Sequence, residues 1–209
     1  MPAKAVTQRI RVVANESQIN AVDLSGKTCL VTGATSGLGK ATATALAKRG
    51  ATVVLGCRNT KAGDTIASEI RAEVGCPNDR VVVGPPLDLD SNDSVKSFAE
   101  GFATDHPRLH LLVNNAGTNF LPKKFSPQGV GRIAQINFLG PAVLTRLLER
   151  PILDAAAESG VANIVHVSSV THRYASIPDV NKFLTTWEAG SYAATKLANV
   201  AFAYECQRR

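Results

Sequence analysis

Tyr192 and Lys196 are the two side chains whose types and spacing most directly suggest catalysis. They stand four residues apart in the segment SYAATKLANVAFAYECQRR (191–209), which reads as one helix, so both lie on the same helix face. A nearby ammonium favours the deprotonated form of a phenol, and such a phenol can exchange protons at neutral pH. Taken alone, the pair is more typical of a surface contact, and its meaning depends on the motifs that accompany it.

A glycine-rich turn, TGATSGLG over residues 32–39, stands between an apolar run and an alanine-rich stretch. Gly33, Gly37 and Gly39 allow the backbone to turn tightly and to approach a pyrophosphate, which would lie at the positive N-terminus of the next helix. The spacing G-x-x-x-G-x-G in a strand–turn–helix setting predicts a dinucleotide-binding turn. The alternative is a glycine-rich turn with a structural role only.

The end of the second apolar run bears on which dinucleotide binds. Folds of this kind usually carry an acid there that binds the ribose 2′-hydroxyl, whereas this sequence reads LGCRN, with Cys57 in that place and Arg58 after it. No carboxylate repels a 2′-phosphate and a guanidinium can pair with it, so NADP (NADPH) is favoured over NAD. The alternative is that Arg58 is an ordinary exposed residue at the start of a helix.

Four motifs, in this order, resemble those of the short-chain dehydrogenase/reductase (SDR) family: TGATSGLG, NNAG (114–117), VSS (167–169) and YAATK (192–196). The resemblance covers about residues 26–209. It implies an NADP-dependent oxidoreductase that transfers a hydride between a nicotinamide and an alcohol or carbonyl substrate. The segments CRN (57–59), NFLGP (137–141) and VSSVTHR (167–173) are most similar to the branch of the retinol dehydrogenases, WW-domain oxidoreductases and protochlorophyllide reductases.

The resemblance also implies a role for each matching residue. Tyr192 would be the catalytic acid/base, Lys196 its partner, and Ser169 the hydroxyl that orients the substrate. Asn137 would complete the catalytic set, Asp88 and Leu89 would hold the adenine, and NNAG would support the nicotinamide half. No metal site is expected. The expected cofactor-binding residues are Gly33, Ser36, Gly37, Leu38, Gly39, Arg58, Asp88, Leu89, Asn115, Ala116, Gly117, Tyr192 and Lys196.

Pro141 follows Asn137 by four residues and has no N–H group. If both residues are helical, the carbonyl of Asn137 therefore lacks its usual helix donor. In the family that the sequence resembles, this carbonyl binds a water that links the catalytic lysine to solvent. The sequence thus supplies a reason for such a proton relay.

Alternating strands and helices must position these residues. Apolar runs predict strands at 28–33, 52–56, 80–89, 109–115 and 161–169, and helices are predicted at 37–50, up to Gly75, after Ser91, at 127–150 and from about 190. This alternation indicates βαβ units, so we expect an α/β fold with a doubly wound, Rossmann-type parallel sheet.

The least regular stretch, residues 170–190, predicts a surface loop beside the site. His172, Tyr174 and Trp187 lie on this loop and could line a substrate pocket. His166 lies on the fifth predicted strand and has no partner motif, so it is interpreted as a hydrogen-bonded strand histidine without a catalytic role.

The composition fits one globular domain: 209 residues, of which 44% are hydrophobic and 19% charged. We expect an N-terminal extension over 1–26 and an NADP-binding domain over 27–209. The net charge is +6, but the basic residues are dispersed without interleaved aromatics, which disfavours nucleic-acid binding. Four scattered cysteines indicate reduced thiols and a cytoplasmic location, while Arg9 and Arg11 leave an organellar transit segment open. No apolar run approaches the roughly 20 residues of a membrane span.

The sequence departs from the family pattern after the Tyr–Lys helix. Family members continue into a sixth strand, a substrate-binding segment and usually a seventh strand, none of which is present here, so we expect a C-terminally incomplete domain. The alternative to an enzyme is then a non-catalytic NADP-binding or regulatory protein. The substrate would be a small alcohol or carbonyl compound, lipophilic if the branch resemblance holds, and a homo-oligomer stays open.

Overall fold

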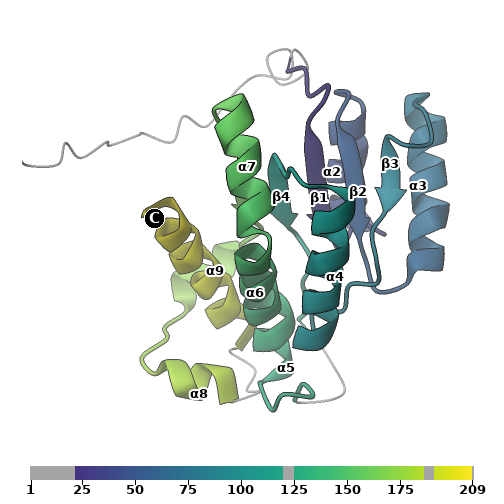
Figure 1. Ribbon diagram of the computed structural model, residues 1–209. Helices are drawn as coiled ribbons and strands as arrows, with labels where there is room; N and C mark the ends of the chain where they lie inside the picture. Colours follow the sequence, from purple (N-terminus) through teal and green to yellow (C-terminus); the bar gives the residue numbers. More distant parts are fainter. Residues whose placement is uncertain (1–21, 120–124, 186–190, 209) are drawn as a thin grey trace, which may run out of the picture.

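Five parallel strands form a sheet in the computed structural model, which describes residues 22–119, 125–185 and 191–208. Every neighbouring pair of strands is parallel, and the strand order is β3-β2-β1-β4-β5. This arrangement confirms the expected doubly wound α/β fold (Figure 1). The strands are β1 (Thr28–Thr32), β2 (Thr52–Gly56), β3 (Val81–Val83), β4 (Leu111–Asn114) and β5 (Asn163–His166).

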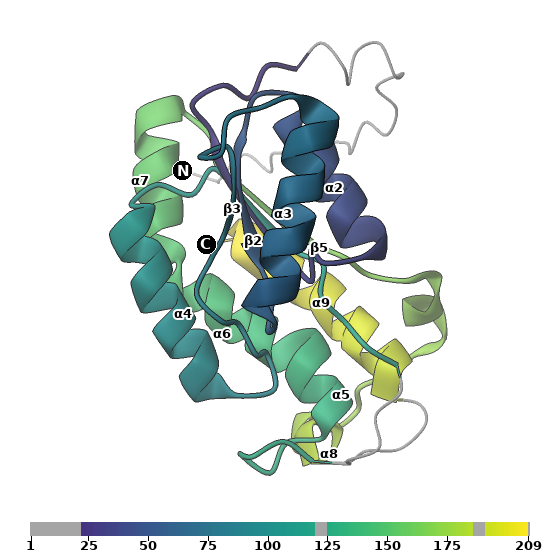
Figure 2. The same cartoon turned by 90° about the vertical axis from the view of Figure 1, so that its right-hand side faces the viewer.

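Helices cover both faces of the sheet (Figures 1 and 2). One face packs against α2 (Gly37–Ala47) and α3 (Thr60–Val74), and the other against α4 (Asn92–Asp105), α6 (Gly140–Leu147) and α7 (Glu149–Ser159). The remaining helical elements are α5 (Arg132–Ala134), the π turn η1 (Gln135–Leu139), the 3-10 turn η2 (Val170–Tyr174), α8 (Val180–Thr185) and α9 (Ser191–Arg208).

The two faces of the sheet bury two separate hydrophobic cores. Because side chains alternate along a strand, Leu30 of β1 belongs to the core that contains Phe98 of α4, whereas Val31 belongs to the core that contains Ile70 of α3. All four side chains are 0% exposed. Burial on both faces explains why the strands read as nearly continuous apolar runs in the sequence.

Two helix ends fall where the sequence predicts them, the C-terminus of α3 at Gly75 and the N-terminus of α4 at Ser91. The side chain of Asn59 accepts a hydrogen bond from the Ala62 N–H at 3.1 Å, and Gly75 ends α3 in a left-handed conformation with φ of +71°. Ser91 caps α4 in the same way. Val95, Phe98 and Phe102 form the apolar face of α4, and all three are 0% exposed.

The prediction of one long helix over 127–150 is wrong in its bounds and its continuity. The helical path begins at Arg132 and ends at Ser159, with a π turn at Gln135–Leu139 and a break at Leu148. Because Pro141 offers no N–H to the Asn137 carbonyl, the hydrogen-bond pattern shifts locally, and Gly140 donates to the carbonyl of Gln135 five residues back. A proline is tolerated in the first turn of a helix, so Pro151 does not end α7.

The predicted loop over 170–190 is partly helical, because η2 and α8 lie within it. Phe183 of α8 is only 9% exposed and packs against the ring of Phe138, with the ring centroids 5.8 Å apart. This apolar contact anchors the segment. Residue Trp187 and residues 1–21 of the predicted N-terminal extension (1–26) lie outside the described residues. The third and fifth strands are shorter than predicted, since β3 ends at Val83 and β5 contains four residues.

Replacing Phe98 with alanine is expected to lower the free energy of unfolding by about 3–5 kcal/mol, because the ring is fully buried and leaves a cavity. The matched control is Phe125→Ala, whose side chain is 45% exposed and which we expect to cost less than about 1 kcal/mol. Urea unfolding of both variants measures the difference. Equal losses for the two variants would contradict the assignment of the core.

Candidate active site

Arg58 and the pair Asp88 and Leu89 follow β2 and β3, whereas the other predicted site residues lie near the carboxyl ends of β1, β4 and β5. The sheet register pairs Val31 with Val113 and Val113 with Val165, so the turns that follow these strands begin side by side. Those turns carry the glycine-rich, NNAG and VSS motifs. Helix α9, which carries Tyr192 and Lys196, contacts β5, η1 and η2 at this end of the sheet.

The glycine-rich turn packs tightly against the NNAG turn. Gly33 has φ of +65°, and a Cβ at this position would lie 2.9 Å from the Cα of Ala116. A Cβ on Gly39 would overlap the carbonyl of Gly33 and the side chain of Asn115. Both positions therefore require glycine, and together they bring the N-terminus of α2 to the end of β1.

The N-terminus of α2 is open for a ligand. Ser36 is its N-cap residue, but the Ser36 side chain makes no capping hydrogen bond. A Cβ on Gly37 would meet nothing within 4 Å, and Leu38 is 73% exposed. Uncapped N–H groups and the helix dipole favour an anion at such a place, so this turn fits the phosphates of a dinucleotide.

The NNAG turn is fixed by the hydroxyl of Thr32. This oxygen accepts hydrogen bonds from the N–H groups of Asn115 and Ala116, each at 3.1 Å. The Asn115 side chain donates to the carbonyl of Thr32 at 2.9 Å. The glycine-rich turn and the NNAG turn are thus one hydrogen-bonded unit.

The segments predicted to hold the adenine side lie next to this unit. The Gly33 N–H donates to the carbonyl of Gly56 at 2.9 Å, and the Leu87 N–H donates to the carbonyl of Cys57 at 2.9 Å. Arg58 follows directly and is exposed. Burial, with a smaller contribution from Asp64, raises the pKa of the Cys57 thiol, so this residue is neutral and apolar in character.

Asn137 occupies a buried position between three segments, and its side chain is 1% exposed. Its Oδ1 accepts a hydrogen bond from the Thr118 N–H at 2.7 Å. Its Nδ2 donates to the Thr118 carbonyl at 2.7 Å and to Thr195 Oγ1 at 3.2 Å. Asn137 therefore joins the π turn to the chain after NNAG and to α9.

Lys196 is buried beside Tyr192. Its Nζ lies 5.5 Å from the centroid of the Tyr192 ring and donates to the Val167 carbonyl at 2.8 Å. The residue is only 4% exposed, and burial lowers the pKa of its ammonium. A Cβ on Gly117 would lie 3.4 Å from both Lys196 Nζ and Asn137 Oδ1, so the bare glycine keeps the space beside the lysine open.

The VSS segment is hydrogen-bonded to α9, and the hydroxyl of Ser169 can still donate a hydrogen bond. Ser168 Oγ donates to the Lys196 carbonyl at 2.8 Å. Ser169 Oγ accepts from the Thr171 N–H at 3.3 Å and from Thr171 Oγ1 at 3.1 Å. Since Ser169 accepts in both contacts, its own hydroxyl proton is left to donate elsewhere.

Thr195 is a site residue that the sequence reasoning missed. It is 0% exposed, and its hydroxyl accepts from Asn137 and donates to the Tyr192 carbonyl at 2.6 Å. The signal was a hydroxyl residue directly before Lys196 within the YAATK motif.

His172 and Tyr174, which the sequence suggested as pocket residues, differ from one another in their placement. His172 Nδ1 contacts the Ser169 carbonyl at 2.6 Å, whereas Tyr174 is 85% exposed.

The interpretation of His166 as a fully hydrogen-bonded histidine is wrong in part. Its Nδ1 lies 3.4 Å from Asn114 Nδ2, but its Nε2 is buried and has no hydrogen-bond partner among the described residues. The ring of Phe202 covers it edge to face, with centroids 5.3 Å apart. Burial lowers the pKa of His166 to about 4, so the ring is neutral near neutral pH.

A groove of about 890 Å³ runs along the outer edge of β5, and its lining includes Ile164, His166 and Phe202. None of the predicted catalytic or cofactor-binding residues lines it, so the groove is separate from the candidate site.

Within residues 22–119, 125–185 and 191–208, no group of three or more His, Cys, Asp and Glu side chains is placed to hold a metal ion. In the same residues, no helix combines the length and the apolar character that crossing a membrane requires.

Comparisons with known proteins match most of the length of this chain. The family model described as short chain dehydrogenase matches residues 27–208. Human retinol dehydrogenase 12 is 40% identical over 190 residues, which cover 90% of this chain, and the chain spans only 58% of the length of that relative.

Two solved structures share the fold. An uncharacterised protein from Mycobacterium paratuberculosis has a TM-score of 0.73 and 32% identity, with 90% of this chain and 64% of that chain covered. A metagenomic short-chain oxidoreductase in complex with NADP has a TM-score of 0.68 and 25% identity, with 88% and 76% covered.

The stability of the fold is expected to decrease as the pH falls from about 6.5 to about 4, because of His166. Burial lowers its pKa to about 4 in the folded chain from 6.5, so the unfolded chain takes up the proton first. The contribution of the neutral ring is complete above about pH 6.5 and is lost toward pH 4, with a size of roughly 3 kcal/mol at most. Urea unfolding at a series of pH values measures it.

His166→Asn serves as the comparison for this pH dependence. Removing the imidazole should make the pH profile shallower over the same range, although His106 and His110, whose pKa values burial also lowers, keep part of the slope. An identical slope in the wild-type chain and the variant would exclude His166 as its source.

Proposed function

The chain belongs to the short-chain dehydrogenase family, within its retinol dehydrogenase branch, and we propose that it transfers a hydride between NADP(H) and an alcohol or carbonyl substrate. The observation that carries this proposal is the buried cluster at the carboxyl end of the sheet. There Lys196 lies against the ring of Tyr192, and the VSS segment and Asn137 are bonded to the same helix, α9.

Tyr192 would serve as the acid/base. When bound, NADPH supplies the hydride, and the carbonyl oxygen that receives negative charge then needs a proton. The Tyr192 hydroxyl would give that proton, while the ammonium of Lys196 stabilises the phenolate left behind. Lys196 has three N–H donors and gives one to the Val167 carbonyl, so the others can bind the phenol and the ribose hydroxyls.

Ser169 and Asn137 would orient the reacting groups. The hydroxyl of Ser169 accepts two hydrogen bonds from Thr171, which directs its own proton to the substrate oxygen. Asn137 holds the chain after NNAG against α9, and its position next to Lys196 fits a proton path along the π turn. Such fixed geometry favours catalysis because the groups need not reorganise during the reaction.

NADP is the proposed cofactor because of the residues after β2. Cys57 is buried with a raised pKa and carries no charge that would repel a 2′-phosphate, and Arg58 is exposed beside it. The open N-terminus of α2 fits the pyrophosphate, and Asp88 and Leu89 would hold the adenine. A structural neighbour of this chain is an oxidoreductase in complex with NADP, which supports the same choice.

The proposed substrate is a lipophilic alcohol or the corresponding aldehyde or ketone. The support comes from the relatives, since human retinol dehydrogenase 12 is 40% identical over 190 residues. Phe183 of α8 and Phe138 form one apolar cluster with Ala198 of α9, the helix that carries Tyr192, and this cluster would give the site one apolar wall.

Tyr192→Phe is expected to lower turnover by about a hundredfold or more, because general acid catalysis contributes that much. Binding of NADPH should change by less than about threefold, since the ring remains. Tyr204→Phe is the matched control on the same helix, with a side chain that is 66% exposed, and should leave turnover unchanged. NADPH oxidation with a panel of aldehydes and ketones, and fluorescence titration of NADPH, measure the two quantities.

The wild-type chain in the same assay separates the enzyme from the alternative. A chain that binds NADPH but consumes none with any aldehyde or ketone would be the non-catalytic NADP-binding protein. A Tyr192→Phe variant that keeps full turnover would contradict the role of the phenol.

Arg58→Met is expected to weaken NADPH binding by roughly tenfold or more and to leave NADH binding unchanged, because only NADPH has a 2′-phosphate for the guanidinium. Arg108→Met, at the amino end of β4, is the matched control and should affect neither cofactor. Titration of each variant with both cofactors measures the ratio. An unchanged ratio for Arg58→Met would remove this residue from cofactor selection.

A further inference from the structure

A buried ion pair joins the turn after β3 to the start of α5. Arg132 Nε donates to Asp90 Oδ2 at 2.6 Å, and the two side chains are only 17% and 10% exposed. In every other ion pair between described residues, both side chains are at least 35% exposed. A buried carboxylate depends on its partner far more than an exposed one does, so this pair holds its two segments together.

Asp90 is connected directly to Asp88, the residue that the proposed function assigns to the adenine. The Asp90 N–H donates to Asp88 Oδ1 at 3.1 Å and so orients that carboxylate. The second oxygen of Asp90, Oδ1, is buried and has no hydrogen-bond partner in the described part of the chain, so Arg132 supplies the compensation for this charge. The guanidinium thus holds the side chain of Asp90, and the backbone N–H of Asp90 in turn bonds the carboxylate of Asp88.

Gln135 lies three residues after Arg132 and bonds the same segment, residues 88–92, at a second point. It is 0% exposed, and its Nε2 donates to the Leu89 carbonyl at 3.1 Å and to Asn92 Oδ1 at 3.0 Å. Gly140 packs against the same carbonyl, since a Cβ there would lie 2.5 Å from it. The helical segment 132–140 therefore contacts the turn 88–92 at three places: the side chain of Asp90, the carbonyl of Leu89 and the side chain of Asn92 at the start of α4.

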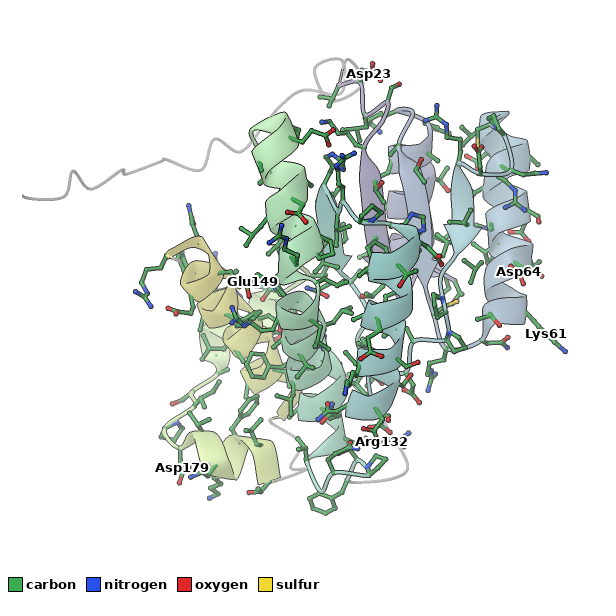
Figure 3. The ribbon with its side chains drawn as sticks, viewed as in Figure 1. Asp23, Lys61, Asp64, Arg132, Glu149 and Asp179 are labelled. Carbon is green, nitrogen blue, oxygen red and sulfur yellow. The ribbon has the colours of Figure 1, made fainter. Side chains whose placement is uncertain are left out.

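The opposite side of this segment reaches the catalytic end. Asn137 is two residues from Gln135, and residues two apart on a helix point in nearly opposite directions, so Asn137 bonds to Thr118 and Thr195 instead. Figure 3 shows Arg132 at the end of the molecule where α4 begins. One short helical segment therefore links the proposed adenine turn to the proposed catalytic set.

We propose that Arg132 and Gln135 are positioning residues for the cofactor, which hold the turn of Asp88 and Leu89 in the conformation that binds the adenine. The proposal rests on the proposed function of the site. Neither residue touches the reacting groups, so their removal should weaken binding of the adenine half and spare the nicotinamide half.

The test compares three ligands on the full chain: NADPH, adenosine 2′,5′-bisphosphate and reduced nicotinamide mononucleotide. Arg132→Met should weaken the first two by about tenfold, because the residues that hold the adenine turn lose their support, and should leave the third within about twofold. Arg132→Lys keeps the charge and should restore most of the affinity. Arg150→Met is the matched control, because the ion pair of Arg150 with Asp154 has side chains that are 84% and 39% exposed.

A second variant and a second measurement guard against simple unfolding. In the double variant Asp90→Asn, Arg132→Met no unpaired charge is left, so the fold should recover while the affinity for adenosine 2′,5′-bisphosphate stays low. Hydrogen exchange of the peptide 87–92 should be faster in Arg132→Met and in Gln135→Met than in the wild-type chain and in Arg150→Met.

The outcomes separate this proposal from the function on which it rests. Equal loss for all three ligands would mean a general structural role and would overturn the proposal, as would full affinity in Arg132→Met. If the wild-type chain binds NADPH and only these variants behave otherwise than expected, the proposed function stands without the positioning role. A wild-type chain that binds none of the three ligands overturns both.

Discussion

The hydrogen bonds of the Asn137 side chain are the constraint on which the arrangement of the site depends. One buried amide satisfies the backbone of Thr118 in both directions and also bonds to Thr195, so three segments from different parts of the sequence meet at a single group. A buried amide that loses such partners is costly, and alternative packings of these segments are correspondingly unfavourable. The Thr195 hydroxyl in turn donates a hydrogen bond to the carbonyl of Tyr192, so Asn137 is linked through Thr195 to the backbone of Tyr192.

The parallel sheet supplies the other half of this arrangement. Because all five strands run in the same direction, every turn that follows a strand emerges at one end, and the β1–β4–β5 register brings three of these turns together. The close approach of Gly33 to Ala116 and the hydroxyl of Thr32 then join two of the turns. The chain can therefore bring the proposed anion-binding end of α2 and the proposed proton donor to the same end of the sheet.

The sequence predicted the features that depend on local signals. The strand–helix alternation, the end of α3 at Gly75 and the cap of α4 at Ser91 follow from periodicity and from single residues. The π turn and the extension of α7 past Pro151 were missed because they depend on which hydrogen bonds the folded chain forms. The roles of Thr195 and His166 depend on contacts with distant residues, and the Asp90–Arg132 pair joins positions separated by 42 residues. Such contacts leave no pattern in one sequence.

The buried ion pair also has an evolutionary consequence. A substitution at Asp90 or Arg132 alone leaves the charge of the other residue uncompensated in a largely buried place, whereas a paired replacement by neutral residues of similar volume can be nearly neutral for folding. The two positions are therefore not free to drift independently. Descendants of this protein should either inherit both charges or lose both. The order of the two changes would decide how large a loss of folding stability the intermediate sequence must tolerate.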